Sequence, residues 1–132
     1  KYKRADYICI DTPELRLAVQ SLYGEIPDMA EKLRKQLHVP DLMVSLGPNG
    51  TLFFAKDGIV YKTPIFPATV VDRVGAGDAL FAVTSPCVYR KCPPDILGLI
   101  ANCVGSMAIE VVCNREFIDP VTLKKYITYL LK

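Results

Sequence analysis

Apolar and polar residues alternate along the first half of the chain in the pattern of strands separated by helices. Two short apolar runs, over residues 5–10 and 41–46, predict strands, and the second is apolar enough for the buried centre of a parallel sheet. Between them, apolar residues at helical spacing predict helices over 14–23 and 28–37. The first half therefore predicts the order strand, helix, helix, strand.

Turn-forming residues predict a hairpin in the middle of the chain. The sequence PNG at 48–50 and the pair DG at 57–58 flank two short apolar runs, so strands are predicted over 51–55 and 59–62. The run ATVV predicts one more strand over 68–71.

The last third of the chain is predicted to be helical. A helix begins at Ala79, and Pro86 is expected to interrupt it, because proline lacks the N–H that a helix interior requires. A second helical stretch is predicted over 93–112, and an amphipathic helix over 120–131. Strands that alternate with helices indicate an α/β fold. We expect a mostly parallel sheet flanked by helices, with the hairpin at its edge, in one domain over 1–132.

Composition and charge exclude several classes of partner. The chain has 132 residues, 16 of them basic and 14 acidic, which gives a formal net charge of +2. This balance argues against a nucleic-acid surface, and no apolar run has the roughly 20 residues that span a membrane. Apolar residues make up 51% of the chain. We interpret this high share as surface that a partner chain or a missing segment covers.

The cysteines predict a reduced, cytoplasmic protein. Their number is odd, no pair has the spacing C-x-x-C, and His38 is the only histidine, so the sequence offers no closed zinc site. We expect buried, reduced thiols that pack as small apolar side chains. The five positions are Cys9, Cys87, Cys92, Cys103 and Cys113.

The glycine-rich segment before the first helix of the last third carries the clearest chemistry. Gly75, Ala76 and Gly77 lead into Asp78, where a helix is expected to begin. Free N–H groups at a helix start bind anions, and a carboxylate there suits a site where it takes the proton of a hydroxyl beside a phosphate. The alternative is an ordinary turn whose aspartate stabilises the helix start. Leu80 breaks the dinucleotide pattern G-x-G-x-x-G, which disfavours a nicotinamide-binding domain, and no Walker lysine motif is present.

The segment VDRVGAGDALFA resembles the signature of the ribokinase-like (PfkB) carbohydrate kinases, D-x-x-[GA]-A-G-D. The resemblance implies a ribokinase-like fold, with Asp78 as the catalytic base. It also implies that Gly75, Ala76 and Gly77 form the anion hole for the transferred phosphoryl group.

Two further motifs resemble those of the same family. SLGPNG at 45–50 is similar to T-L-G-x-x-G, which implies that Ser45, Gly47 and Gly50 contact ATP. DTPE is similar to N-x-x-E, which implies that Glu14 and Asp11 hold magnesium through water and that Asp11 contributes to the ATP site. The alternative for this pair is a helix N-cap followed by a first-turn glutamate.

Two single positions also match the family. Asn102 matches a position near the adenine, which implies a contact with ATP. Asp72 matches an aspartate through which some members bind a monovalent cation.

The resemblance covers only the nucleotide-binding, C-terminal part of such a kinase. It implies an enzyme that uses Mg-ATP to phosphorylate a hydroxyl of a sugar or sugar phosphate, nearest in character to heptose-phosphate kinases. The chain does not begin with Met, and we expect it to be cut from something longer or processed. Without the N-terminal half, we expect it to be inactive and to associate with itself. The alternative is a non-catalytic nucleotide-binding or assembly module derived from such a kinase.

Overall fold

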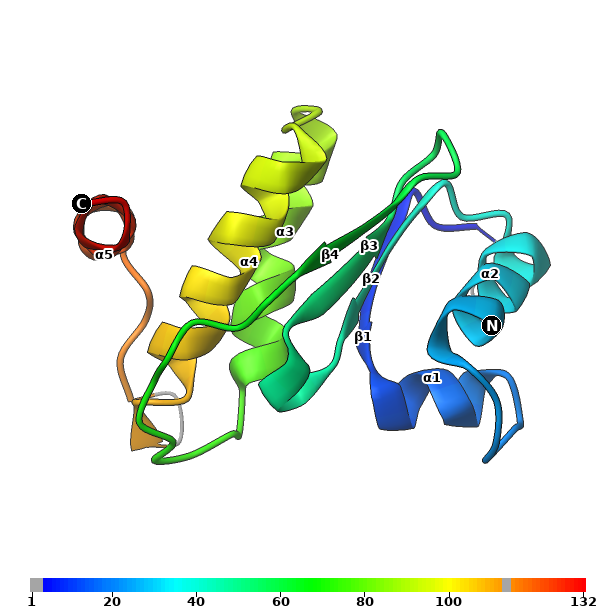
Figure 1. The fold of residues 1–132 in the computed structure, drawn as a ribbon, viewed down its shortest axis with the longest axis horizontal. Coiled ribbons are helices and arrows are strands. Elements are labelled where there is room, and N and C mark those ends of the chain that lie inside the picture. Colours follow the sequence, from blue (N-terminus) through cyan, green and yellow to red (C-terminus); the bar gives the residue numbers. More distant parts are fainter. Residues whose placement is uncertain (1–3, 113–114) are drawn as a thin grey trace.

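The computed structural model describes residues 4–112 and 115–132, and in it a four-stranded sheet lies between two layers of helices (Figure 1). One face carries α1 and α2, and the other carries α3 and α4, while α5 packs on α4 beyond the sheet. The strands are β1 (Tyr7–Asp11), β2 (Asp41–Ser45), β3 (Thr51–Phe54) and β4 (Val60–Thr63). The helices are α1 (Thr12–Ala18), α2 (Ile26–Leu37), α3 (Ala76–Tyr89), α4 (Pro94–Ala108) and α5 (Pro120–Leu130), with a 3₁₀ turn at Gly47–Asn49.

The sheet has the order β1-β2-β3-β4, so β1 and β4 are its edges. The expected α/β class is confirmed, but the expectation of a mostly parallel sheet does not hold within this chain. Only β1 and β2 are parallel, while β2–β3 and β3–β4 are antiparallel. The reason is connection length: α1 and α2 provide a crossover between β1 and β2, whereas the two later connections are short turns that reverse the chain.

Each face of the sheet builds its own core. Side chains alternate between the two faces of a strand, so neighbouring residues join different clusters. Leu42 and Val44 pack with Leu15 and Leu33 under α1 and α2, whereas Met43 packs with residues of α3 and α4. The second cluster also includes Phe53, Leu80, Leu97 and Ala101, with Tyr7 and Cys9 against it.

Two helices differ from the sequence prediction. Helix α1 begins at Thr12 and ends at Ala18, because Gln20 takes a left-handed conformation with φ of 54°. Helix α3 continues through Pro86 to Tyr89, so the predicted interruption is wrong. Pro86 lies in the last turn and removes only the hydrogen bond to the carbonyl of Ala82. Because Ala82 is exposed, water can donate a hydrogen bond to that carbonyl instead.

The predicted strand over 68–71 is also wrong, because its backbone pairs with the end of α4 and not with a strand. The N–H groups of Val71 and Asp72 both donate to the carbonyl of Ile109, at 2.8 and 3.0 Å. The N–H of Thr69 donates to the carboxylate of Glu110 at 3.3 Å. Helix α4 correspondingly ends at Ala108, earlier than the predicted residue 112.

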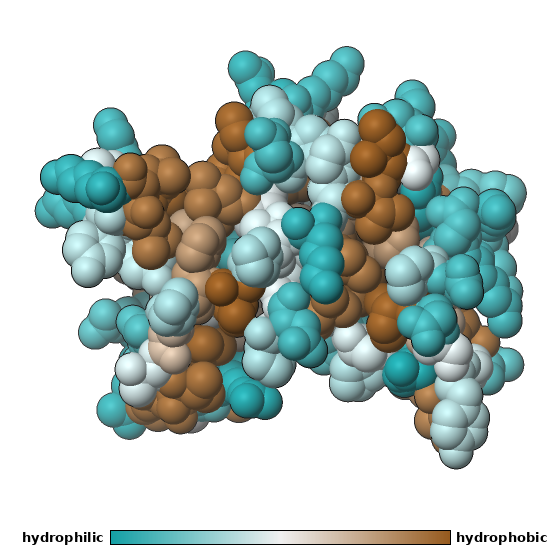
Figure 2. Space-filling model, viewed as in Figure 1, coloured by the Kyte–Doolittle hydropathy of each residue, from teal (hydrophilic) through white to brown (hydrophobic). Residues whose placement is uncertain are grey.

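Apolar side chains reach the surface at several places. Figure 2 shows apolar surface over α5 and over the loops below it. Among the apolar side chains, Val71, Val74 and Val121 are each more than half exposed. This agrees with the high apolar share of the sequence. No helix in the described ranges is both long and apolar enough to cross a membrane.

Candidate active site

A cleft of about 500 Å³ lies where β1 and β2 end and α3 begins. Asp11 and Ser45 are register partners at the carboxyl ends of these two parallel strands, so both reach the same edge of the sheet. In α/β sheets this edge is the usual place for ligands. The cleft is lined by β1, by Glu14 and Ser45, and by the start of α3 with Gly75, Gly77 and Asp78. The structure thus brings one or more residues of each of the three motifs to this cleft: Asp11, Glu14, Ser45, Gly75, Gly77 and Asp78.

The start of α3 offers free N–H groups to the cleft. Gly75 precedes the helix in a left-handed conformation, with φ of 82°, and provides no side-chain cap. The N–H of Ala76 donates to the carbonyl of Arg73 at 3.3 Å, whereas those of Gly77 and Asp78 have no partner among the described residues. A Cβ at Gly77 would meet nothing within 4 Å, so an anion can approach these amides closely.

Asp78 is exposed in the first turn of this helix and lines the cleft. Its carboxylate forms no hydrogen bond or ion pair with the described part of the chain. A carboxylate beside free amides can take a proton from a hydroxyl while the amides bind the oxygens of a phosphate. The geometry therefore suits phosphoryl transfer to a hydroxyl, as the sequence predicts.

Asp11 and Glu14 form a capping box at the start of α1. Asp11 Oδ1 accepts from the N–H of Glu14 at 2.7 Å, and Glu14 Oε2 accepts from the N–H of Asp11 at 2.9 Å. The N-cap interpretation is therefore confirmed. The second oxygen of each carboxylate is free of these two bonds, and both residues line the cleft.

This pair fits a magnesium ion that is bound through water. Within the described ranges, no three His, Cys, Asp or Glu residues come close enough to hold a metal directly. Mg²⁺ usually keeps several water ligands and needs only one or two carboxylates besides the phosphates of its substrate. Asp11 and Glu14 match that requirement.

The loop at 45–50 divides into two parts. Ser45 borders the cleft, and its carbonyl accepts from the hydroxyl of Thr12 at 3.2 Å. Gly47 is exposed, and a Cβ on it would meet nothing within 4 Å. Gly50 is buried, and a Cβ there would lie 2.0 Å from the carbonyl oxygen of Thr63. Neither glycine lines the cleft. The close approach of Thr63 explains by itself why position 50 is a glycine.

Asn102 and Asp72 lie outside the cleft. Asn102 is only 3% exposed, and its side-chain nitrogen donates to Thr51 Oγ1 at 3.1 Å and to the carbonyl of Gly98 at 2.8 Å. Asp72 lies in the loop before α3, where its Oδ1 accepts from the N–H of Val74 at 3.0 Å. The structure therefore does not bring these two residues to the carboxylates of the cleft.

The cleft is also lined by Tyr7, Cys9 and Phe81, which belong to none of the sequence motifs. Tyr7 and Cys9 share a face of β1 with Asp11, and Phe81 lies one turn after Asp78. The two-residue period of a strand and the 3.6-residue period of a helix therefore place these side chains on the same side as Asp11 and Asp78. Burial raises the pKa of the Cys9 thiol to about 11 and raises the pKa of Tyr7 above its usual range. Both groups thus stay neutral in the cleft.

The four described cysteines are free thiols, and Cys113 lies outside the described residues. Cys103 is buried as expected, whereas Cys9, Cys87 and Cys92 are half-buried.

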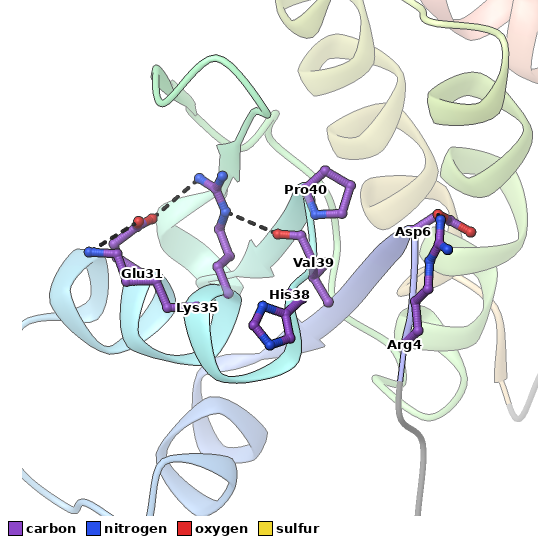
Figure 3. A pocket seen from close by; sticks show the side chains of 8 residues that line it. Arg4, Asp6, Glu31, Lys35, His38, Val39 and Pro40 are labelled. Atoms are coloured by element: carbon purple, nitrogen blue, oxygen red, sulfur yellow. Dashed lines mark hydrogen bonds and ion pairs between the residues drawn. The ribbon is translucent and has the colours of Figure 1, made fainter.

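A second hollow of about 570 Å³ lies at the opposite ends of the strands (Figure 3). Each of its Arg, Lys, Asp and Glu side chains forms an ion pair: Arg34 and Lys35 pair with Glu31 at 3.3 and 3.6 Å, and Arg4 pairs with Asp6 at 3.4 Å. Arg34 also donates to the carbonyl of Val39 at 3.4 Å. Because these charges are already paired, this hollow is a weaker candidate than the cleft.

Comparison with known proteins identifies the family. Residues 2–118 match the model of the pfkB family carbohydrate kinases. A curated relative, 2-dehydro-3-deoxygalactonokinase of Haloferax volcanii, is 31% identical over 78 residues, which are 59% of this chain and 24% of that protein.

Solved structures show the same fold. Ribokinase of Arabidopsis thaliana, complexed with ribose and ATP, superposes with a TM-score of 0.82 at 22% identity, covering 96% of this chain and 42% of that one. Phosphofructokinase-2 of Escherichia coli, in complex with substrates and products, gives a TM-score of 0.79 at 19% identity, covering 98% and 42%. The expected ribokinase-like fold is confirmed. The chain spans about a quarter of the curated relative and about two-fifths of these structures.

Proposed function

The chain belongs to the pfkB family of carbohydrate kinases, and we propose that residues 1–132 form the nucleotide-binding and catalytic-base part of a kinase that phosphorylates a sugar or sugar phosphate from ATP. One observation carries the proposal. The free amides of Gly77 and Asp78, the carboxylate of Asp78 and the carboxylates of Asp11 and Glu14 line one cleft at the carboxyl ends of β1 and β2.

Each residue has a role in the transfer. The carboxylate of Asp78 takes the proton of the acceptor hydroxyl, whose oxygen forms a bond to the γ-phosphorus as the bond to the ADP oxygen breaks. The amides at the start of α3, with Gly75 and Ala76 shaping the turn, stabilise the charge on the phosphoryl oxygens. Asp11 and Glu14 would hold a hydrated magnesium ion, which would neutralise charge on the phosphates of ATP.

Ser45 and the exposed Gly47 lie at the start of the loop at 45–50. We expect a nucleotide bound in the cleft to extend along this loop. The roles of Gly50 and Asn102 toward ATP, and of Asp72 toward a monovalent cation, remain predictions for a ligand-bound form. A cytoplasmic location also remains a prediction.

The same proposal includes a partner for β1. This strand is an edge of the sheet, and the cleft contacts four consecutive residues of it, Tyr7, Ile8, Cys9 and Ile10. Consecutive strand residues point to opposite faces, so a cleft that contacts all four runs along the unpaired edge. We therefore expect the sugar-binding, N-terminal half of the kinase to cover this edge. The chain alone would be inactive and would associate with itself.

The open edge also favours a second candidate, a non-catalytic nucleotide-binding or assembly module. Such a module would bind ATP without turnover even when a sugar-binding half is supplied. The exposed Asp78 argues for the kinase, because its negative charge beside the anion site would repel a bound phosphate and weaken binding in a module that needs no base.

The test is Asp78→Asn in a form of the protein that also carries the sugar-binding half. General-base loss lowers kcat by about 10²–10⁴-fold, while ATP affinity by calorimetry stays nearly unchanged. Asp95→Asn is the matched control, since Asp95 is an exposed acid in the first turn of α4 and does not line the cleft. An Asp78→Asn enzyme that turns over like the Asp95→Asn enzyme would rule out the base assignment.

A further inference from the structure

Tyr7 connects the sheet to two points of α3. Its ring stacks on the ring of Phe81, with centroids 6.1 Å apart and planes 11° apart. Its hydroxyl lies 2.9 Å from Thr84 Oγ1. Phe81 and Thr84 are three residues apart and therefore face the same side of the helix. A single side chain of β1 thus restrains both the rotation of α3 and its position along its axis.

The direction of the hydrogen bond follows from the geometry. The hydroxyl of Thr84 is fully buried and donates to the carbonyl of Leu80 at 2.7 Å. A threonine hydroxyl has one proton, so toward Tyr7 it can only accept, and the phenol must donate. Burial raises the pKa of Tyr7 above its usual range, which keeps that proton on the phenol.

The contact lies close to the residues that the chemistry needs. Asp78 precedes Phe81 by three residues and Thr84 by six, or about 4.5 and 9 Å along a helix axis. Asp78 and the Gly77 amide move with α3, whereas Asp11 and Glu14 belong to the other side of the cleft. A displacement of about 1 Å between reacting groups costs about 10²-fold in rate. The orientation of α3 on β1 therefore matters for transfer.

We propose that Tyr7 and Thr84 are positioning residues whose hydrogen bond sets the place of Asp78 and the Gly77 amide relative to Asp11 and Glu14. The proposal rests on the proposed function of Asp78. Neither residue touches the transferred group. Each acts through the orientation of α3, and Phe81 provides the second point of contact.

Two substitutions at Thr84 separate positioning from packing. Thr84→Val keeps the shape of the side chain and removes the hydroxyl, whereas Thr84→Ser keeps the hydroxyl and removes a buried methyl group. If the hydrogen bond positions α3, Thr84→Val lowers kcat by about 10–100-fold in a form that also carries the sugar-binding half, with a smaller change in KM for ATP. Thr84→Ser then retains most of the wild-type kcat. A purely packing role predicts the reverse order, because serine leaves a cavity.

Further variants complete the design. Tyr7→Phe keeps the ring on Phe81 and removes the donor, so it should lower kcat as Thr84→Val does. Ser85→Ala is the matched control, because Ser85 makes the same kind of bond within α3, to the carbonyl of Phe81 at 2.6 Å. It should leave kcat at the wild-type value. Thermal melts of all variants show whether a loss of rate reflects unfolding.

A readout without activity keeps the inference distinct from the proposed function. In NMR spectra of the chain, Thr84→Val should abolish the slowly exchanging hydroxyl proton of Tyr7 and shift the amide resonances of Gly77 and Asp78, and Ser85→Ala should do neither. A wild-type form that carries the sugar-binding half and still phosphorylates no sugar refutes the proposed function. Unchanged Gly77 and Asp78 resonances in Thr84→Val, or an unchanged kcat in an active enzyme, refute the positioning role.

Discussion

Replacing Gly50 by alanine should destabilise the fold far more than the same change at Gly47, three residues earlier in the same loop. Gly50 has φ of 87° and ψ of −139°, a region that only glycine adopts readily. An added Cβ would lie 2.0 Å from the carbonyl oxygen of Thr63 and 3.0 Å from two backbone atoms of the next residues. Thr63 pairs with Thr51 in the sheet, so this backbone cannot move away cheaply.

The size of the effect follows from the backbone strain at position 50 and from the steric overlap of the added Cβ with Thr63. Backbone strain of this kind costs about 1–3 kcal/mol, and forcing an atom into a packed site costs about 1–3 kcal/mol more. Gly47 has φ of 58° and open space around its Cβ position, so Gly47→Ala costs only the left-handed conformation, about 1–2 kcal/mol. Both variants gain about 0.4–1 kcal/mol from a less flexible unfolded chain. We expect Gly50→Ala to be less stable than Gly47→Ala by about 2 kcal/mol or more, a large part of a typical stability of about 5–15 kcal/mol.

Urea denaturation of the two variants and the wild type, followed by circular dichroism, measures the difference in the free energy of unfolding. Gly47→Ala keeps the fold, so a change in its ATP affinity would report contact between this loop and the nucleotide. Equal destabilisation by the two substitutions would refute the reasoning, since it would mean that the approach of Thr63 to Gly50 does not constrain the loop.

Two further predictions concern the cleft and the open edge of the sheet. Gly77→Val should weaken ATP binding in a calorimetric titration, because the side chain would cover the free amides of Gly77 and Asp78. Gly105→Val, at another open helical glycine, should leave ATP binding unchanged. Equal ATP affinities of the two variants would remove the anion-hole assignment. The 132-residue chain should associate with itself in light scattering and show no sugar kinase activity, because the edge of β1 is unpaired. A monodisperse, active monomer would contradict both expectations.

Residues of the predicted motifs meet in one cleft because they lie where elements begin and end. Asp11 ends β1, Ser45 ends β2 and Asp78 lies in the first turn of α3, so local signals for strand ends and helix starts also indicated which residues lie together. The capping box shows the limit of such signals. The same two residues, Asp11 and Glu14, satisfy the start of α1 and face the cleft, so a structural role and a metal-binding role are not exclusive here.

The features that the sequence could not predict depend on distant partners. The run at 68–71 has strand-forming residues, but a strand needs a neighbour, and the carbonyl of Ile109 takes its N–H groups instead. Pro86 has a strong local signal for a break, which its place in the last turn of α3 makes harmless. Tyr7 and Thr84 are 77 residues apart, and neither has a motif that indicates the other.

The architecture of the cleft explains why a kinase built on this chain would need a cover on β1. The groups assigned to the nucleotide and the base come from β1, β2, α1 and α3, all present here, but Asp78 is exposed and the cleft opens along the free edge of β1. Phosphoryl transfer to a sugar competes with transfer to water, so an active enzyme must exclude solvent from its base. A partner strand on β1 would pair the open edge and close this side of the cleft at once. The surface through which we expect the isolated chain to associate is thus the same surface that its proposed chemistry requires to be covered.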